Sequence, residues 1–288
     1  MAQILDGKAL AEAIKIDLKQ QVAKIHKDSG RAPGIAVILV GDDPASHVYV
    51  KNKLKYAEDL GVQAFSFYLE ADTAELILLE HIERLNQDPI IDGILVQLPL
   101  PKHINVERVL TKIAVNKDID GFHAENIGKL ALRQQGLHPC TPKGIMTLLQ
   151  HYVGDIMGAN AVVVGASNIV GRPMALELLN AQCTVTICHR ATRNLQAETL
   201  RADILIAAAG VPHLIDQTMV KKGAMVVDVG IHRLPDGRLT GDVAFDQVEP
   251  IAAWISPVPG GVGPMTIATL MQNLLHAYQL NNQEGRVA

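Results

Sequence analysis

The sequence has few cysteines, few aromatic residues and no long apolar run, and each shortage excludes a class of protein. Its three cysteines, Cys140, Cys183 and Cys188, form neither a CxxC pair nor a cysteine–histidine metal motif. The simplest interpretation is small buried side chains in a reducing compartment, with a nucleophilic Cys140 as the alternative. No apolar run approaches the ~18 residues that a membrane-spanning helix needs.

Charge and aromatic content also argue against a nucleic-acid partner. Aromatic residues make up 3% of the 288 residues, and the formal net charge is -4. We therefore expect neither a base-stacking surface nor a basic footprint for nucleic acid. Asp6 and Lys8 stand where a signal peptide would have its apolar core, which favours a cytoplasmic protein. Hydrophobic residues, at 48%, are enough for a large core, and the length fits one large domain or two ordinary ones.

Helical and strand-like segments alternate along the first half, which is typical of an α/β protein. The periodicity predicts helices over residues 7–28, 46–60 and 73–86, and strands over residues 34–40, 62–69 and 91–98. The first and last of these strands are continuous apolar runs, the pattern of strands buried on both faces of a parallel sheet. Asp72-x-x-Glu75 is expected to form a capping box for the third helix.

A polar, loop-like stretch over residues 117–141 is expected to mark the passage between two domains. Thr141 is then expected to cap a helix with Pro142 in its first turn. The later elements are strands at 161–164, 184–188, 203–207 and 224–229, helices at 173–179 and 265–280, and a hairpin turn at 234–239. The segment 257–264, rich in proline and glycine, is expected to be neither helix nor central strand.

A glycine loop at 165–171 follows a buried strand and opens a helix, which is the context of a dinucleotide-binding fingerprint. Glycines there let the backbone approach a pyrophosphate at a helix N-terminus. Ser167 replaces the second glycine and Gly171 comes one residue late, so a tight turn without a ligand is the alternative. The next strand ends in His189-Arg190 and not in an acid, which favours NADP over NAD unless Arg190 belongs only to an exposed basic turn.

Four polar residues of the first half are candidates for chemistry. Tyr49 and Lys53 are four residues apart, so they share a helix face, as a catalytic pair or as part of a solvated helix. Short-chain dehydrogenases use the same spacing, but their glycine loop precedes the pair. Gln97 ends a buried strand, where it either faces a ligand crevice or caps the strand. Asp120 lies in an irregular stretch, where an Asx-type turn is the alternative to a ligand contact.

Six segments in this order resemble the bifunctional methylenetetrahydrofolate dehydrogenase/methenyltetrahydrofolate cyclohydrolase family. They are Tyr49-Val50-x-x-Lys53 and residues 92–101, 117–123, 139–144, 163–171 and 257–266. The resemblance spans nearly the whole chain and implies two α/β domains across a cleft. The first would be a catalytic, folate-binding domain over residues 1–139, completed by a C-terminal helix over 266–288. The second would be a Rossmann-like NADP-binding domain over residues 140–265.

The resemblance implies NADP-dependent oxidation of 5,10-methylenetetrahydrofolate to 5,10-methenyltetrahydrofolate, followed by hydrolysis to 10-formyltetrahydrofolate. This chemistry belongs to one-carbon metabolism and purine biosynthesis. The alternatives are a monofunctional NAD(P)-dependent dehydrogenase of the same family and a non-catalytic nucleotide-sensing protein of the same fold. The family is typically a cytosolic homodimer formed through the nucleotide domain, and the resemblance implies no metal.

By position, Lys53 matches the family's catalytic lysine, Tyr49 and Gln97 its active-site partners, and Asp120 its pterin-binding acid. In the hydrolysis, a neutral Lys53 amine would assist the attacking water as it loses a proton. The resemblance implies further substrate contacts from Leu98, Pro99, Pro259, Gly260 and Gly261, and cofactor contacts from Gly165, Ala166, Ser167, Ile169, Arg190 and Ile231. The family often has arginine where Ala166 stands, so Arg190 would carry more of the 2′-phosphate recognition.

Overall fold

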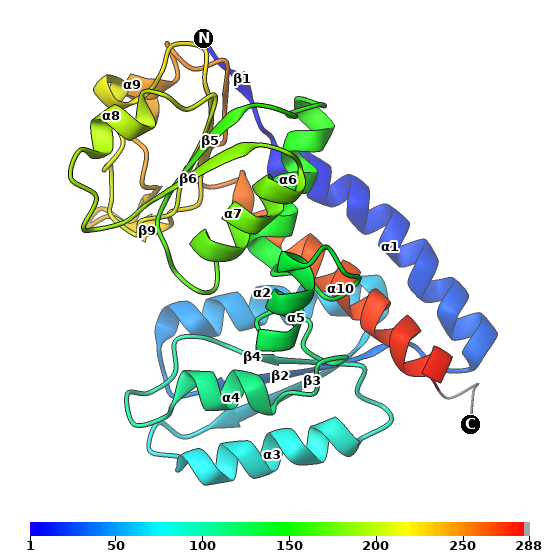
Figure 1. Cartoon of the computed structure of the whole chain (residues 1–288). Helices are drawn as coiled ribbons and strands as arrows, with labels where there is room; N and C mark the ends of the chain where they lie inside the picture. Colours follow the sequence, from blue (N-terminus) through cyan, green and yellow to red (C-terminus); the bar gives the residue numbers. More distant parts are fainter. Residues whose placement is uncertain (285–288) are drawn as a thin grey trace. The chain divides into compact units, whose positions relative to one another are not determined.

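The computed structural model describes residues 1–284, which divide into two compact units. Unit 1 comprises Met1–Glu12 and Pro139–Thr269, and unit 2 comprises Ala13–His138 and the chain from Leu270 onward. Each unit has its own parallel sheet (Figure 1). Two long helices, α1 (Gly7–Ser29) and α10 (Val262–Glu284), have residues in both units.

Unit 2 is built on a parallel three-stranded sheet in the order β3-β2-β4. Its elements are β2 (Gly34–Val40), α2 (Pro44–Leu60), β3 (Gln63–Leu69), α3 (Glu75–Gln87), β4 (Gly93–Val96), α4 (Val106–Lys112) and α5 (Ala124–Ala131). Every residue of β2 and β4 is buried, as their apolar runs predict. Alternate β2 residues such as Ile38 pack with Ile82 of α3 and Val109 of α4 in one core.

Unit 1 contains a six-stranded parallel sheet in the order β1-β11-β8-β7-β5-β6. Its strands are β1 (Gln3–Ile4), β5 (Asn160–Val164), β6 (Thr184–Cys188), β7 (Ile204–Ala207), β8 (Met225–Asp228) and β11 (Trp254–Ile255). The other elements are α6 (Cys140–Tyr152), α7 (Gly171–Asn180), α8 (Leu195–Thr199), the 3-10 helix η1 (Gln217–Met219), α9 (Phe245–Val248) and the antiparallel hairpin β9 (His232–Arg233) and β10 (Leu239–Thr240). The carboxyl ends of parallel strands meet at one edge of the sheet, where ligands of α/β proteins bind.

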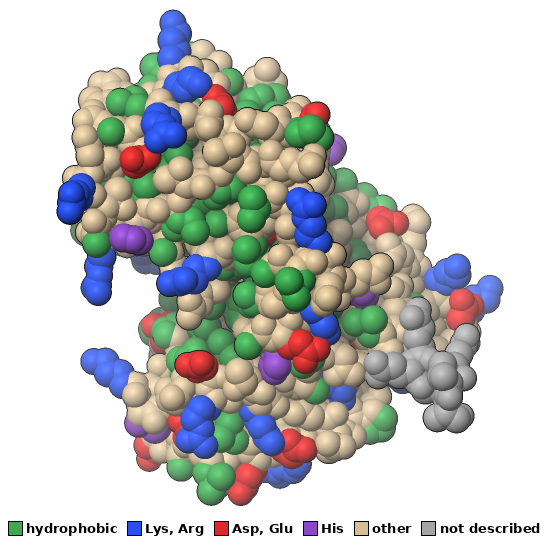
Figure 2. Space-filling view, in the orientation of Figure 1, with side chains coloured by type: hydrophobic (Ala, Val, Ile, Leu, Met, Phe, Trp, Pro, Cys, Tyr) green, Lys and Arg blue, Asp and Glu red, His purple; other side chains and the backbone are tan. Residues whose placement is uncertain are grey.

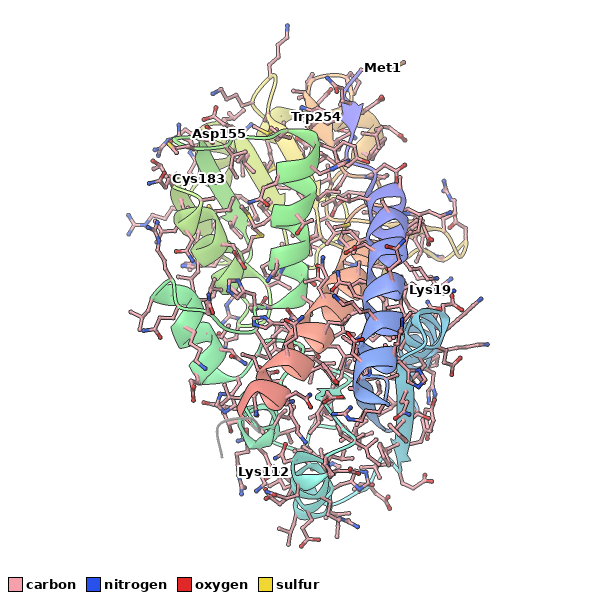
Figure 3. The ribbon with its side chains drawn as sticks, turned by 90° about the vertical axis from the view of Figure 1, so that its right-hand side faces the viewer. Met1, Lys19, Lys112, Asp155, Cys183 and Trp254 are labelled. Carbon is pink, nitrogen blue, oxygen red and sulfur yellow. The ribbon has the colours of Figure 1, made fainter. Side chains whose placement is uncertain are left out.

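The predicted α/β class is confirmed, but the first residues lie in a different unit from the one expected. β1 pairs in parallel with β11, with Gln3 opposite Trp254, and Figure 3 shows Met1 beside Trp254. Leu5 is fully buried. Residues 1–12 therefore pack with residues 139–269, and not with the rest of the predicted domain 1–139. Of the predicted C-terminal helix over 266–288, residues 285–288 lie outside the described part.

Two predicted helix caps are wrong. Ala74 occupies the N-cap position of α3, and the Glu75 carboxylate instead accepts the Asn105 N–H at 2.6 Å and pairs with Arg108. Pro139 occupies the N-cap position of α6, while Thr141 lies inside the first turn with Pro142. The Thr141 hydroxyl is 3.0 Å from that of Thr266. In both places a contact far away in the sequence prevails over the local capping pattern.

Two helices extend into segments that the sequence predicts to be irregular. α5 interrupts the loop-like stretch 117–141, and its His123 side chain caps it by accepting the Glu125 N–H at 3.1 Å. α10 begins at Val262, inside the proline- and glycine-rich segment 257–264. Pro264 fits there because the first turn of a helix leaves its N–H groups unpaired in any case.

The surface and the cysteines agree with the composition. On the face shown in Figure 2, acidic and basic side chains are interspersed over unit 2. Among residues 1–284, no helix combines the length and the apolarity needed to cross a bilayer.

Cys140, Cys183 and Cys188 are free thiols and buried. Burial raises the pKa of the Cys183 and Cys188 thiols.

Candidate active site

Lys53 and Gln97 meet in unit 2, where the end of β4 lies beside α2. The Lys53 Nζ donates to the Gln97 Oε1 at 3.0 Å. The Gln97 Nε2 donates to the Leu98 carbonyl oxygen at 2.6 Å, so the amide oxygen faces the lysine. The Gln97 backbone N–H donates to Ile38 O at 2.8 Å, which anchors this residue to the sheet. The Leu98–Pro99 peptide that follows is cis.

α2 fixes where Tyr49 and Lys53 lie. Its N-cap residue, Asp43, accepts the Ser46 N–H at 2.8 Å, and Pro44 suits the first turn because its missing N–H would have no helical partner. Tyr49 and Lys53 both belong to this helix, one turn apart, so they share a face as the spacing predicts. Tyr49 is 39% exposed and Lys53 is half-buried.

Asp120 lies in a loop that buried side chains hold in place. Asp118, which is buried, accepts the His123 N–H at 2.7 Å and the Asn126 Nδ2 at 2.9 Å. Asp120 is half-buried, and desolvation raises its pKa to about 6, while Lys53 lowers that pKa and Asp118 raises it. The Lys53 cation is thus close enough to favour the Asp120 carboxylate. Lys53, Gln97 and Asp120 form one polar cluster.

The glycine loop of unit 1 has the backbone of a close-approach turn. Gly165 has a φ of +132°, and a Cβ at this position would overlap the Ala208 carbonyl oxygen. A Cβ at Gly171 would overlap the carbonyl oxygen of Gly165. The Ser167 Oγ accepts the N–H groups of Val170 at 3.2 Å and Gly171 at 3.3 Å, which leaves its own hydroxyl proton available to donate. The loop opens directly into α7.

Two arginines stand at this loop. The Gly165 N–H donates to Cys188 O at 2.9 Å, which places the end of β6 beside the first glycine, and the exposed Arg190 follows two residues later. Arg172 is also exposed, and its Nε donates to Ala166 O at 3.2 Å. The loop therefore combines a glycine cradle, a helix N-terminus and two guanidinium groups. This set fits a phosphorylated dinucleotide.

The remaining predicted site residues also lie in unit 1. The Val258–Pro259 peptide is cis, and Gly260 has a φ of +109°. The Gly260 carbonyl oxygen accepts the Lys8 N–H at 2.8 Å, and Gly261 N–H donates to Pro257 O at 2.9 Å. Ile231 follows β8 and is 45% exposed, and Ile169 is half-buried within the glycine loop. The structure thus gathers the Lys53 cluster in one unit, and the glycine loop and the Pro259 turn in the other.

Two family models match the chain. The catalytic domain of tetrahydrofolate dehydrogenase/cyclohydrolase matches residues 5–120, and the NAD(P)-binding domain of the same family matches residues 139–282. The chain belongs to the tetrahydrofolate dehydrogenase/cyclohydrolase family.

Relatives match this dehydrogenase/cyclohydrolase over nearly its whole length. The "Bifunctional protein FolD" of Acidithiobacillus ferrooxidans is 57% identical over 276 residues, which is 96% of each chain. The crystal structure of the bifunctional FolD enzyme from Campylobacter jejuni has a TM-score of 0.95 and 48% identity, covering 97% of this chain and 100% of that one. The FolD of Trypanosoma brucei, complexed with NADP cofactor and an inhibitor, has a TM-score of 0.93 and 38% identity, covering 97% and 98%.

The protein is therefore a bifunctional enzyme of one-carbon metabolism, with methylenetetrahydrofolate dehydrogenase and methenyltetrahydrofolate cyclohydrolase activities. The family membership sets aside the non-catalytic nucleotide-sensing protein, and the bifunctional relatives set aside the monofunctional dehydrogenase.

The sequence reading of this dehydrogenase/cyclohydrolase missed two residues. The Arg172 side chain donates a hydrogen bond to Ala166 O across the turn of the glycine loop, and neither helical nor strand spacing predicts this contact. Asp43 lies before the predicted start of the helix over residues 46–60, although an aspartate one residue before a proline indicates the start of a helix.

Proposed function

We propose that Lys53 is the proton-accepting residue of the cyclohydrolase step and that Gln97 and Tyr49 position it. The observation that carries this proposal is the bond between the Lys53 Nζ and the Gln97 Oε1, at 3.0 Å. Gln97 is held at its backbone by β2 and at its amide by Leu98, so its oxygen stays aimed at the lysine. Tyr49 lies one turn earlier on the same face of the helix.

The chemistry of the second step calls for such a group. The methenyl compound is a cation, and a water molecule that attacks it must lose a proton. In the free enzyme Lys53 is the cation that favours the Asp120 carboxylate, whereas beside the cationic methenyl compound a neutral Lys53 amine would avoid like-charge repulsion and accept this proton. Asp120 is the matching acid, because its carboxylate accepts hydrogen bonds from the amino edge of the pterin ring. Leu98 and Pro99 border the same substrate.

NADP is the cofactor of the first step. When bound, its nicotinamide ring accepts a hydride from the methylene carbon of the folate, so the protein mainly positions the two rings. We assign the contacts to NADP to Gly165, Ala166, Ser167, Ile169 and Ile231, with Arg190 and Arg172 at the 2′-phosphate. The Arg172 guanidinium at Ala166, and the exposed Arg190 two residues after the end of β6, favour this assignment, because charge-assisted bonds to phosphate are strong.

The division of the chain follows from these two sets of residues. We assign folate binding and catalysis to unit 2, which includes the later part of α10, and cofactor binding to unit 1. Pro259, Gly260 and Gly261 complete the substrate contacts, since a turn with a positive φ at Gly260 exposes backbone groups to a ligand. We further propose a cytoplasmic homodimer that has no nucleic-acid or membrane partner.

Replacing Lys53 by methionine tests the proposal directly. Lys53→Met keeps the length of the side chain and removes the amine. We expect hydrolysis of methenyltetrahydrofolate to fall by about 10²–10⁴-fold, the usual contribution of acid–base catalysis. The binding of NADP should be unchanged. The decay of the methenyl absorbance and a fluorescence titration with NADP measure the two quantities.

Lys51→Met is the matched control, since Lys51 is an exposed lysine two residues away on the same helix. It should hydrolyse the methenyl compound at the wild-type rate. Hydrolysis by Lys53→Met at the wild-type rate would contradict the role of Lys53.

A further inference from the structure

Two buried aspartates of unit 1 lie outside the assignments made so far. Asp228 is the last residue of β8, and Asp242 follows β10 of the hairpin. Asp228 is 4% exposed and Asp242 is 0% exposed. Two carboxyl groups are seldom buried side by side, because each loses its hydration and an ionised pair repels. A buried pair of carboxyl groups is tolerated where hydrogen bonds to both groups offset the cost of burial.

Asp228 holds the segment that carries Asp242. Its Oδ1 accepts the N–H groups of Gly230 and Asp242, and its Oδ2 accepts the N–H of Val243, each at 2.9 Å. Its own N–H donates to the Ser256 Oγ at 2.8 Å. Burial nevertheless raises the pKa of Asp228 to about 6, with the three backbone bonds lowering that pKa and Asp242 raising it.

Asp242 connects the loops that follow β7 and β8. Its Oδ2 accepts the N–H of Ala209 at 2.6 Å and that of Gly210 at 2.8 Å, both directly after β7. Its Oδ1 is 2.7 Å from the Nε2 of His232, which follows β8. A Cβ at Gly230 would overlap both the carboxylate and the backbone nitrogen of Asp242, so only glycine leaves room for Asp242 here.

These loops touch the proposed cofactor site. A Cβ at Gly165 would overlap the carbonyl oxygen of Ala208, the residue before Ala209, and the Ala208 N–H donates to Val164 O at 2.8 Å. On the other side of the network, Ile231 is the neighbour of His232 and is exposed. The Asp242 carboxylate thus holds the backbone that follows Ala208, and it also holds His232, the neighbour of the predicted cofactor contact Ile231.

We propose that Asp242 and His232 are positioning residues of the dehydrogenase, which hold residues 208–210 and Ile231 in the conformation that receives NADP. This inference rests on the proposed cofactor site at residues 165–171. His232 acts through Asp242, which its side chain contacts at 2.7 Å. Because the His232 side chain is 20% exposed whereas Asp242 is fully buried, His232 is the member that can be replaced without opening the core.

The test compares three variants of the full chain. His232→Ala removes the donor to Asp242, while His232→Gln places an amide donor near the position of the ring Nε2. His213→Asn is the matched control, because His213 is an exposed histidine that contacts the same hairpin through the Thr240 hydroxyl at 2.7 Å. Asparagine tolerates the positive φ of 54° at this position. KM for NADP, KM for methylenetetrahydrofolate, kcat and the melting temperature are measured for each.

We expect His232→Ala to raise KM for NADP about tenfold, the effect of one lost charge-assisted bond, with KM for the folate unchanged. His232→Gln should restore KM for NADP to within about threefold of the wild type, and His213→Asn should leave it unchanged. A purely structural role would instead lower the melting temperature and leave both KM values alone. That result, or an equal rise in the two KM values, overturns the proposal.

Arg190→Ala separates this inference from the proposed cofactor site. If Arg190→Ala leaves the affinity for NADP unchanged, the assignment of the loop is wrong. If Arg190→Ala weakens NADP and His232→Ala does not, the loop stands and the positioning role falls.

Discussion

The carboxyl group of Asp120 is subject to two opposing influences. Burial raises its pKa to about 6, and the nearby Lys53 cation lowers it. At neutral pH the group is therefore ionised, as the proposed acceptor for the pterin would have to be. The half-buried charge lowers the stability of the fold. The proposed role and the stability of the protein are therefore in conflict at this residue.

Replacing Asp120 by asparagine should reveal the conflict as a change in pH dependence. Below about pH 4 the Asp120 carboxyl group is protonated in both the folded and the unfolded protein, so it does not destabilise the fold. As the pH rises through about 6, the buried group must ionise, and the protein loses stability relative to the unfolded chain. The free energy of unfolding of Asp120→Asn, relative to wild type, should therefore be higher at pH 8 than at pH 4, by about 1–3 kcal/mol. Urea unfolding at both pH values measures it.

Asp72→Asn is the control, since Asp72 is an exposed aspartate of the same unit. It should give no such pH-dependent gain. A relative stability of Asp120→Asn that is the same at both pH values would show that burial does not govern this carboxyl group. Asp120→Asn should also lose activity, because the amide cannot reproduce an acceptor at both oxygens.

The loops after β5 and β6 act as one element at the carboxyl edge of the sheet. The bond from Gly165 to Cys188 joins them, and Arg172 and Arg190 extend from α7 and from the end of β6. In the proposed cofactor site, Arg172 and Arg190 together offset the absence of an arginine at Ala166. We propose that both cations contact the 2′-phosphate.

Single replacements of these arginines should alter the choice between NADP and NAD. We expect Arg190→Ala and Arg172→Ala each to weaken NADP by about 1.5–3 kcal/mol, the value of a hydrogen bond to a charged group, and to leave NAD unaffected. Dehydrogenase rates at varied NADP and NAD measure this. Equal losses for both cofactors would show that neither arginine reads the 2′-phosphate. Arg201→Ala, at an exposed arginine after α8, serves as control.

The elements that the sequence predicted best are those whose burial is uniform. β2 was predicted to the residue, because a strand covered on both faces requires an unbroken apolar run. The capping box at Asp72 failed because Glu75 contacts Asn105 and Arg108, which are distant in the sequence. β1 could not be assigned, since two residues carry no periodicity and the strand exists only through β11.

The chain divides into two compact units, and α10 has residues in both. Its residues from Leu270 onward belong to unit 2, where Leu274 is fully buried and a Cβ at Gly93 would contact it at 2.9 Å. The Asn273 Nδ2 donates to Ile119 O and His138 O, each at 2.8 Å. Unit 2 is therefore incomplete without a segment that lies more than a hundred residues further along the chain.

Truncating Leu274 should destabilise unit 2 more than unit 1. We expect Leu274→Ala to lower the free energy of unfolding by about 2–5 kcal/mol, as for other fully buried leucines. Hydrogen exchange should then show a larger loss of protection in β2 and β4 than in β5 and β7. Gln279→Ala, at an exposed position of the same helix, should change stability by less than about 0.5 kcal/mol. An equal loss of protection in all four strands would contradict the assignment of Leu274 to one core.

The sequence predicted the residues of the candidate site but not the hydrogen bonds that join them. Lys53, Gln97 and Asp120 were named from motif position, and their cluster then followed from how β4 and α2 pack. The contacts of Arg172 and of Asp242 join segments through loops, where neither helical nor strand spacing applies. Side-chain hydrogen bonds across loops depend on the folded backbone, so neither composition nor periodicity could predict them.

The three buried thiols make this enzyme convenient for site-specific labelling. Alkylating reagents attack the exposed thiolate, and burial both shields Cys140, Cys183 and Cys188 and raises the pKa of the last two. A new cysteine at an exposed position such as Gln279 would then react first with a maleimide dye. A fluorophore could thus be attached at one chosen point while every native cysteine stays in place.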